Sequence, residues 1–255
     1  MGNVLGFIPA GGHGKRMKGE LLIKELLPVY IPERKSPILL FENSMITLKQ
    51  AEIDNVVCTI NETKTDLIKY MNLFSAKHRM DVAYVYQDLG NGEYGLPYAI
   101  EKASPYLYHH TVVMRFPDTI IMPEKCVQAL LDFHYKKKSV LTLGVFETEH
   151  PERLAPVGIS EQGEILQIQD KPQKPCAKNT WNCVIWEDPF LDVVKEMVKQ
   201  SRVSEGEKAE LLLYDVFLKC LQRKMPVYGM NISNGLCTDI SSSSDFIRLW
   251  EGAAQ

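Results

Sequence analysis

Glycines and basic residues are concentrated near the N-terminus, in the segment Phe7-Ile8-Pro9-Ala10-Gly11-Gly12-His13-Gly14-Lys15-Arg16-Met17. The segment follows an apolar run from Val4 to Ile8, which predicts a buried first strand. A strand that ends in a glycine-rich turn often binds phosphate, because glycines let backbone N–H groups approach the anion and a basic side chain adds positive charge. These residue types indicate phosphate chemistry, with Arg16 and the later Lys24 as the cations. A glycine turn flanked by solvated basic residues is the alternative.

Two well-known phosphate-binding patterns do not fit this loop. A Walker A loop requires Gly-x-x-x-x-Gly-Lys-Ser/Thr, whereas Pro9 stands at the first glycine and Arg16 at the hydroxyl residue. The dinucleotide fingerprint Gly-x-Gly-x-x-Gly can begin at Gly12 and Gly14, but Met17 occupies its third glycine. The loop therefore follows neither pattern.

Short apolar runs alternate with amphipathic stretches through the first half of the chain, which is typical of βαβ units around a parallel sheet. The expected strands are Asn55–Ile60, Val82–Tyr86, Thr111–Arg115 and Val140–Phe146. The expected helices run from Ser36-Pro37 to about Ala51, and over Lys64–Phe74, Leu96–Ala103 and Pro123–Tyr135. The predicted fold is an α/β structure with a three-layer, doubly wound, mainly parallel sheet of Rossmann-like type.

The pattern changes near His150. Alternation over Pro156–Ile159 and Ile165–Ile168, around Glu161-Gln162-Gly163, predicts a β-hairpin and thus a small β-rich insertion. The elements expected after it are a strand at Trp181–Trp186, helices at about Phe190–Lys199 and Ala209–Leu221, and a strand at about Val227–Ile232 that leads to Asp239. There is no repeat or linker in the sequence, so we expect a single domain over residues 1–255.

Composition narrows the class of protein. A net charge of -3 lacks the global basic field that nucleic-acid binders use, so we expect no nucleic acid as a partner. No apolar run reaches the length of a membrane span, and we expect no membrane partner and no secretory signal. The six cysteines form no Cys-x-x-Cys pair and are typical of a reducing compartment. We therefore expect a cytoplasmic protein, with a homo-oligomer left open.

The glycine segment and the one after it resemble a known signature. Ala10-Gly11-Gly12-x-Gly14-x-Arg16-Met17 followed by Lys24-x-x-x-Pro28-Val29 resembles that of the sugar-1-phosphate nucleotidyltransferases, especially the glucose-1-phosphate thymidylyltransferase and uridylyltransferase branch. The resemblance extends in unbroken motif order to Asp245. It implies one nucleotidyltransferase domain, in which residues 1–148 mainly bind nucleotide and 149–255 mainly bind sugar phosphate. The usual Pro and Thr between Arg16 and Lys24 are missing.

The resemblance implies roles for residues of the first half. The loop residues Ala10, Gly11, Gly12 and Gly14 would bind nucleotide, and Arg16 and Lys24 would be catalytic. Tyr86-Gln87 followed by Tyr94-Gly95-Leu96-Pro97-Tyr98-Ala99 resembles the family's Gln-x-x-x-x-Gly-Leu-Ala-x-Ala, in which Gln and Gly read a pyrimidine edge. An amide can both donate and accept, which suits the imide edge of uracil or thymine. Gln87 as a solvated strand-end residue is the alternative.

Two aspartates are the metal candidates. Asp118 directly follows a predicted buried strand, where open α/β sheets place ligand contacts. Its segment Phe116-Pro117-Asp118-Thr119-Ile120-Ile121 resembles the family's Gly-Asp-Asn-Ile/Leu, whose Asp binds Mg²⁺, and Thr238-Asp239-Ile240 resembles Trp-x-Asp-Thr-Gly. Mg²⁺ commonly takes one or two carboxylates and fills its other positions with phosphate oxygens and water. A turn or helix-cap role is the alternative for both, and Asp239 precedes Ser241–Ser244 as a cap would.

The second substrate is implied by Asp170-Lys171-Pro172, which resembles the family's Glu-Lys-Pro. Asp170 would accept sugar hydroxyls and Lys171 would bind the phosphate as a compact positive charge. Trp181 and Asn182 are expected in the same pocket. Ala155 stands where the family usually has a sugar-contacting Gly, which leaves the identity of the sugar open.

These inferences predict a Mg²⁺-dependent enzyme that transfers a nucleotidyl group from a pyrimidine NTP, dTTP or UTP, to a sugar 1-phosphate, by default glucose 1-phosphate. The attacking phosphate is already an anion, so positioning and charge stabilisation suffice without a general base. One alternative is a cytidylyltransferase acting on a polyol or isoprenoid-precursor phosphate. The other is a non-catalytic nucleotide-sensing homologue. The nucleotide-sensing alternative predicts loss of the charged site residues, but the sequence retains them: Arg16, Lys24, Asp118, Lys171 and Asp239.

Overall fold

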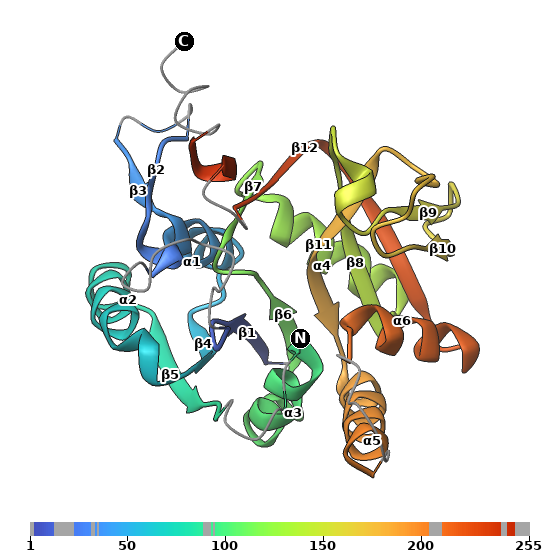
Figure 1. The fold of residues 1–255 in the computed structure, drawn as a ribbon, viewed down its shortest axis with the longest axis horizontal. Helices are drawn as coiled ribbons and strands as arrows, with labels where there is room; N and C mark the ends of the chain where they lie inside the picture. Colours follow the sequence, from blue (N-terminus) through green and yellow to red (C-terminus); the bar gives the residue numbers. More distant parts are fainter. Residues whose placement is uncertain are drawn as a thin grey trace.

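The computed structural model describes residues 3–12, 23–31, 34, 36–88, 93, 95–203, 211–240 and 244–247. These residues form an eight-stranded sheet in the order β5-β4-β1-β6-β11-β8-β12-β7, with helices packed on both faces (Figure 1). The prediction of a three-layer α/β fold with a mainly parallel sheet is therefore confirmed.

The first half of the chain supplies the purely parallel part of the sheet. Its strands are β1 (Val4–Pro9), β4 (Asn55–Ile60), β5 (Asp81–Tyr86) and β6 (Thr111–Met114). Its helices are α1 (Leu40–Gln50), α2 (Thr65–His78) and α3 (Leu96–Leu107). Strand β1 pairs with β4 on one side and with β6 on the other, so the chain builds outward to β5 and then returns through α3 to the opposite side of β1.

The remaining strands mix directions. Strand β11 (Asn179–Trp186) is antiparallel to both β6 and β8 (Leu141–Glu147). Strand β12 (Val227–Asp239) is parallel to β8 and, near its end, antiparallel to β7 (Thr119–Met122). The helices of this part are α4 (Cys126–Lys137), α5 (Asp188–Val203) and α6 (Leu213–Gln222). Among the described helices, none is both long and apolar enough to cross a bilayer.

Short elements complete the fold. Two small sheets pair β2 (Pro28–Val29) with β3 (Ile38–Leu39), and β9 (Val157–Ile159) with β10 (Ile165–Ile168). Figure 1 shows these two sheets at opposite ends of the molecule. Single 3₁₀ turns lie at η1 (Lys24–Leu26), η2 (Glu62–Lys64) and η3 (Pro151–Arg153).

Two apolar layers stabilise the sheet from opposite faces. Helices α1, α2 and α4 contribute to one layer, and α3, α5 and α6 to the other. Neighbouring residues of β1 contribute to different layers. Phe7 packs into the second layer and Ile8 into the first, because successive side chains of a strand point to opposite faces. Both side chains are fully buried, which is the burial expected of a central parallel strand.

The predicted β9–β10 hairpin is present. Its turn closes with hydrogen bonds from the Gly163 N–H to the Ser160 carbonyl (2.9 Å) and from the Ser160 N–H to the Glu164 carbonyl (2.9 Å). Gly163 has a φ of 84°, and a Cβ there would lie 2.7 Å from the Phe133 ring. The turn therefore requires glycine for both its backbone conformation and its close packing.

Several boundary predictions were wrong; helix α4, for example, begins at Cys126 rather than at Pro123. Helix α1 begins at Leu40 rather than at Ser36-Pro37, because Ile38–Leu39 pairs with β2, and the Glu42 carboxylate accepts a hydrogen bond from the Leu39 N–H (3.0 Å). Helix α6 begins at Leu213, after an extended Leu212, rather than at Ala209, which lies outside the described residues.

The last strand continues to Asp239 instead of ending near Ile232, because its second part pairs with β7, a strand that was not predicted. Asp239 is thus a strand residue, and Ser241–Ser243, which the cap interpretation involved, lie outside the described residues.

Candidate active site

The candidate site lies where β1 and β6 end. These parallel strands are neighbours, and the helices of their connections, α1 and α3, pack on opposite faces of the sheet. Such a reversal is the topological switch point at which open α/β sheets bind ligands. The chain continues from β1 into Ala10-Gly11-Gly12 and from β6 into Phe116-Pro117-Asp118. The fold therefore brings the glycine loop and the first acidic candidate to one edge.

Buried polar groups anchor the start of the glycine loop. The Ala10 N–H donates to the Thr59 carbonyl (2.9 Å), and the Asn61 side-chain amide donates to the Gly11 carbonyl (2.7 Å). A Cβ added to Gly12 would meet no atom of the described residues within 4 Å. Gly14 and Arg16, which the sequence places in the same site, lie outside the described residues.

Gln87 lies directly against the glycine loop. Its side chain is 6% exposed, and a Cβ added to Gly11 would collide with its Oε1 atom. The Gln87 N–H donates to the Ile60 carbonyl (2.7 Å), which fixes the residue beside the end of β4. Gly95 caps the N-terminus of α3 with a φ of 129°, a conformation that favours glycine. The structure thus places Gln87 next to Gly11, and reading of a base by Gln87 and Gly95 stays a prediction.

Lys24 reaches the acidic candidate from a different segment. Its Nζ donates a hydrogen bond to Asp118 Oδ2, and both side chains are largely buried. Burial lowers the pKa of Lys24, but three neighbouring carboxylates outweigh this effect and raise the pKa above its usual value. They belong to Asp118, Glu25 and Asp239. Lys24 is therefore held as a cation in the site.

The two predicted metal ligands are brought together by the β7–β12 ladder. Asp239 is opposite Thr119 in this ladder, and Asp118 immediately precedes Thr119. The Ile240 N–H donates to the Asp118 carbonyl (3.1 Å), and the Thr119 hydroxyl donates to Asp239 Oδ1 (3.4 Å). Two aspartates far apart in the sequence are thus structural neighbours, a result that follows from the register of β12.

This donor set has the chemistry that Mg²⁺ requires. Mg²⁺ prefers oxygen ligands and commonly takes only one or two carboxylates from the protein. Within the described part of the chain, no three or more His, Cys, Asp or Glu side chains are grouped so as to hold a metal ion. Asp118 and Asp239 fit a site that is completed by substrate phosphates, and their role as ligands stays a prediction.

Arg115 is a site-adjacent residue that sequence reasoning missed. Its side chain is fully buried, and its guanidinium donates to Thr47 Oγ1 (3.1 Å) and Asn43 Oδ1 (3.2 Å) on α1 and to Asn182 Oδ1 (2.5 Å) on β11. Burial lowers the pKa of Arg115. The available signal was a charged residue at the end of the apolar run Thr111–Arg115, which was interpreted only as the end of a strand.

Helix α1 also holds the turn that carries Asp118. The Ser44 hydroxyl donates to the Phe116 carbonyl (2.6 Å), and Asn43 Oδ1 accepts a hydrogen bond from the Ile121 N–H (3.0 Å). Together with Arg115, these contacts fix the chain on both sides of Asp118. The polar residues Asn43, Ser44 and Thr47 are fully buried. This network therefore supports the site from the protein interior and does not line it.

The residues predicted for the second substrate are gathered beside β11. The Trp181 N–H donates to the Ala155 carbonyl (3.4 Å), and the Lys171 N–H donates to the carbonyl of Leu154, the residue before Ala155 (2.8 Å). Asp170 is exposed, as is the following Lys171, which has a φ of 42°. These residues therefore share one locality.

Trp181 links that locality to the turn after β6. Its ring centroid lies 5.8 Å from that of Phe116 and 5.1 Å from that of Phe217. Among the residues that the structure describes, its buried indole Nε1 has no hydrogen-bond partner, and the same holds for the buried Nε1 of Trp186. Asn182, by contrast, is buried and directs its carbonyl oxygen to Arg115, so the structure gives it an internal partner.

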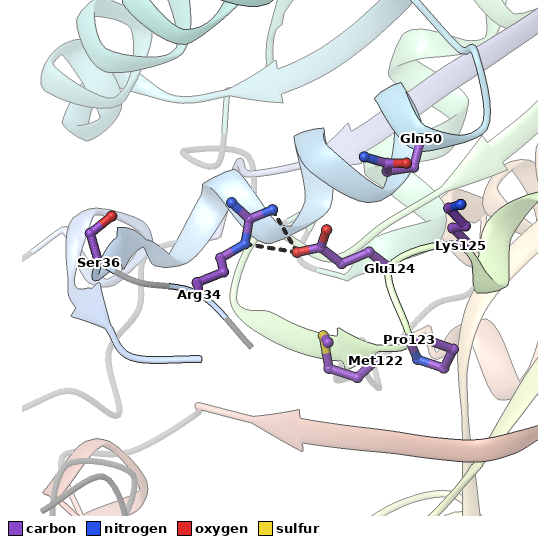
Figure 2. Close-up of a pocket in the computed structure, with 7 residues that line it drawn as sticks. All are labelled: Arg34, Ser36, Gln50, Met122, Pro123, Glu124 and Lys125. Carbon is purple, nitrogen blue, oxygen red and sulfur yellow. Dashed lines mark hydrogen bonds and ion pairs between the residues drawn. The ribbon is translucent and has the colours of Figure 1, made fainter. Parts of the chain in front are cut away.

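A separate cavity lies away from these residues. It has a volume of about 560 Å³, and Figure 2 shows Arg34 and Glu124 joined across it. Its lining residues are Arg34, Ser36, Gln50, Met122, Pro123, Glu124 and Lys125. Arg34 is paired with Glu124 through Nε (2.8 Å) and Nη2 (2.6 Å). Of the residues predicted for the active site, none that the structure describes lines this cavity.

Comparison with known proteins identifies the family. A structure described as a glucose-1-phosphate thymidylyltransferase from Bacillus anthracis, in complex with sucrose, is 19% identical with a TM-score of 0.80, and the match covers 98% of this chain and 95% of that one. The inositol-1-phosphate CTP transferase of T. maritima is 18% identical with a TM-score of 0.69, and the match covers 97% of this chain and 94% of that one. A search of curated proteins found no significant sequence match. The model of the nucleotidyl transferase family matches residues 5–253, and the chain therefore belongs to that family.

Proposed function

We propose that this nucleotidyltransferase transfers a nucleotidyl group from dTTP or UTP to a sugar 1-phosphate, with glucose 1-phosphate as the default acceptor. A phosphate oxygen of the acceptor forms a bond to the α-phosphorus of the NTP, the bond between that phosphorus and the β-phosphate bridging oxygen breaks, and pyrophosphate leaves. The observation that carries the proposal is the convergence of Lys24, Asp118 and Asp239 beside the glycine loop.

Charge and position are what this site contributes to the reaction. The backbone N–H groups of the glycine loop would bind the phosphates, and the Lys24 ammonium would stabilise the charge that develops during transfer. Arg16 would act at the same centre. Mg²⁺, when held by Asp118 and Asp239, would neutralise the phosphate oxygens. The acceptor phosphate is already anionic, so no side chain has to remove a proton from it.

Gln87 and Gly95 are proposed to read the base. The Gln87 side chain lies directly against Gly11, so its carboxamide is close to the loop that is proposed to bind the phosphates. An amide that both donates and accepts is complementary to the imide edge of uracil and thymine. Gly95 opens α3 and offers backbone groups without a side chain in front of them.

The acceptor is proposed to bind beside β11. Lys171 would pair with its phosphate and Asp170 with its hydroxyl groups. Trp181, whose ring packs against Phe116, would line the same pocket. Asn182 would act indirectly, through Arg115. In this proposal the chain functions as a single domain of residues 1–255, with 1–148 mainly for the nucleotide and 149–255 mainly for the acceptor.

A cytidylyltransferase is the second candidate. It is favoured by the fold likeness to the inositol-1-phosphate CTP transferase and by Ala155, which stands at a position where the sugar branch usually has Gly. The acceptor would then be a phosphate of a polyol, a cyclitol or an isoprenoid precursor.

One experiment separates these functions. Purified protein with Mg²⁺ would be incubated with each of dTTP, UTP, CTP, ATP and GTP, in pairwise combination with sugar 1-phosphates, polyol phosphates and inositol 1-phosphate. Pyrophosphate release and the mass of the product would be measured, with the same mixtures lacking the protein as the negative control. Product from dTTP or UTP and a sugar 1-phosphate supports the proposal, and product from CTP and a polyol phosphate replaces it with the second candidate. Nucleotide binding without product from any pair would favour a nucleotide-sensing protein.

A further inference from the structure

One short turn contacts both segments that handle phosphate in the proposed function. It comprises Asn61 and the 3₁₀ turn η2, and it connects β4 to α2. Asn61 binds the glycine loop, and Lys64 binds η1, the turn that carries Lys24. Neither residue was singled out in the sequence, because their partners are distant in the chain.

The Asn61 side chain is buried and makes hydrogen bonds through both Nδ2 and Oδ1. It is 2% exposed, and its Nδ2 donates to the Gly11 carbonyl (2.7 Å). Its Oδ1 accepts hydrogen bonds from the Thr63 N–H (2.9 Å) and the Thr63 hydroxyl (2.7 Å). Oδ1 of Asn61 thus stabilises the η2 turn, and Nδ2 holds the glycine loop. Asn61 therefore links the position of the loop to that of the turn.

Lys64 forms a buried ion pair with Glu25. Its Nζ is 2.8 Å from both carboxylate oxygens, and the two side chains are 4% and 2% exposed. Burying two charges removes them from water, and their attraction repays that cost only with good geometry. Such a pair is therefore weak evidence for stability, and a role in fixing position is the stronger reason for it.

The topology shows what this pair positions. Strand β1 lies between β4 and β6 in the sheet. Glu25 is bound to the turn after β4, and the adjacent Lys24 is bound to Asp118 after β6. Neighbouring residues of a 3₁₀ turn point in directions about 120° apart. Two ion pairs therefore hold η1, one on each side of the end of β1, where the glycine loop begins.

We propose that Glu25, Asn61 and Lys64 are positioning residues of the active site. The Lys64–Glu25 pair fixes the position of the Lys24 ammonium, and Asn61 fixes the position of the glycine loop relative to that ammonium. This inference rests on the proposed function. None of the three residues is required to touch substrate, since each acts through Lys24 or Gly11.

The test removes both charges of the pair at once. In Glu25→Gln/Lys64→Met no unpaired charge is left buried, whereas either single change would leave one. Lys49→Met/Asp54→Asn is the matched control, because that pair (2.7 Å) lies on α1 and the loop after it, outside the site. We expect the kcat of the double variant to fall at least about tenfold, with the Kd for nucleotide changed by less than about threefold, because a small displacement of a catalytic cation mainly affects the transition state.

A second readout does not depend on activity. Labelling with an amine-reactive reagent, read by mass spectrometry, should find Lys24 protected in the natural protein and in the control, and reactive in the double variant. A folded double variant with unchanged kcat, or with Lys24 still protected, would overturn the inference. If the natural protein proved inactive with every substrate pair, the proposed function would fail, and the labelling would still decide whether the pair holds Lys24.

Glu25→Asp covers the case in which the double variant does not fold. It keeps both charges but shortens the side chain by one methylene, so η1 must shift toward Lys64 by roughly an ångström for the pair to re-form. A displacement of about 1 Å can cost on the order of 100-fold in rate. We expect reduced kcat and greater labelling of Lys24, and a folded Glu25→Asp variant that matches the natural protein in both would overturn the inference.

Discussion

The Lys24 ammonium donates a hydrogen bond to the Asp118 carboxylate and thereby joins η1 to the turn after β6. The ion pair brings together a cation proposed to act on phosphate and an anion proposed to bind metal. The carboxylate of Asp239 adds to the negative charge around Lys24. The pair therefore keeps Lys24 charged, and it places the ammonium next to the metal site in the proposed function.

Replacing Lys24 should affect turnover more than binding. Lys24→Met removes the charge at the centre where phosphorus gains an oxygen neighbour, and loss of one preorganised charge of this kind costs on the order of 10²–10³ in rate. Steady-state kinetics and equilibrium nucleotide binding would measure the two effects separately. Near-normal kcat in a folded Lys24→Met variant would remove the residue from the mechanism.

The Lys24 pKa predicts how the ion pair depends on pH. Because the pKa is raised in the folded protein, the stabilisation from Lys24 protonation is fully present below the unfolded pKa, about 10.4, and is lost as the pH rises through the folded value. The difference in free energy of unfolding between the natural protein and Lys24→Met should thus be constant from about pH 7 to 9 and change in favour of Lys24→Met above about pH 10.4. Urea denaturation across this range checks it. A difference that stays constant to high pH contradicts the raised pKa.

Asp118 should control the requirement for metal. Asp118→Asn keeps the shape of the side chain but removes its charge, so we expect the Mg²⁺ concentration for half-maximal activity to rise about tenfold or more. Asp54→Asn is the control, since Asp54 pairs with Lys49 outside the site. Activity would be titrated with Mg²⁺ after treatment with a chelator. Equal Mg²⁺ requirements in the two variants would argue against ligation by Asp118.

Arg115 should be important for stability. Arg115→Met leaves the buried side chains of Asn43, Thr47 and Asn182 without this hydrogen-bond partner, and breaking a buried polar network typically costs about 3–5 kcal/mol. Denaturant unfolding would measure this loss, with the exposed Lys69→Met on α2 expected to change stability by less than about 0.5 kcal/mol. If Arg115→Met matched Lys69→Met, the network would have no stabilising role.

The sequence allowed prediction of those features that depend on local patterns. The apolar run Val4–Ile8 predicted β1, and the position of Asp118 after a second apolar run predicted its place at a strand end. The end of β12 was missed, because it depends on pairing with β7, a strand too short to leave a periodic signal.

The partners of buried polar residues also could not be predicted from local sequence patterns. Lys64 and Glu25 are separated by a long stretch of chain, and each is typical of a solvated residue when considered alone. Arg115 and Asn182 meet only because β6 and β11 are neighbours in the sheet. Topology determines these contacts, and the fold class was predictable without them.

Gly11 and Gln87 provide the last prediction, which concerns base selectivity. A Cβ on Gly11 would collide with Gln87 Oε1, the far end of a flexible side chain, so Gly11→Ala should displace the carboxamide without unfolding the protein. We expect the KM for pyrimidine NTP to rise about tenfold and the preference over purine NTP to fall by a similar factor, since a lost hydrogen bond to a base edge typically costs about 1–3 kcal/mol. Gln87→Ala should produce the same loss, and the double variant should be no worse than either single variant, because both changes remove one interaction. Additive losses of selectivity in this cycle would show that Gln87 does not read the base from its place beside Gly11.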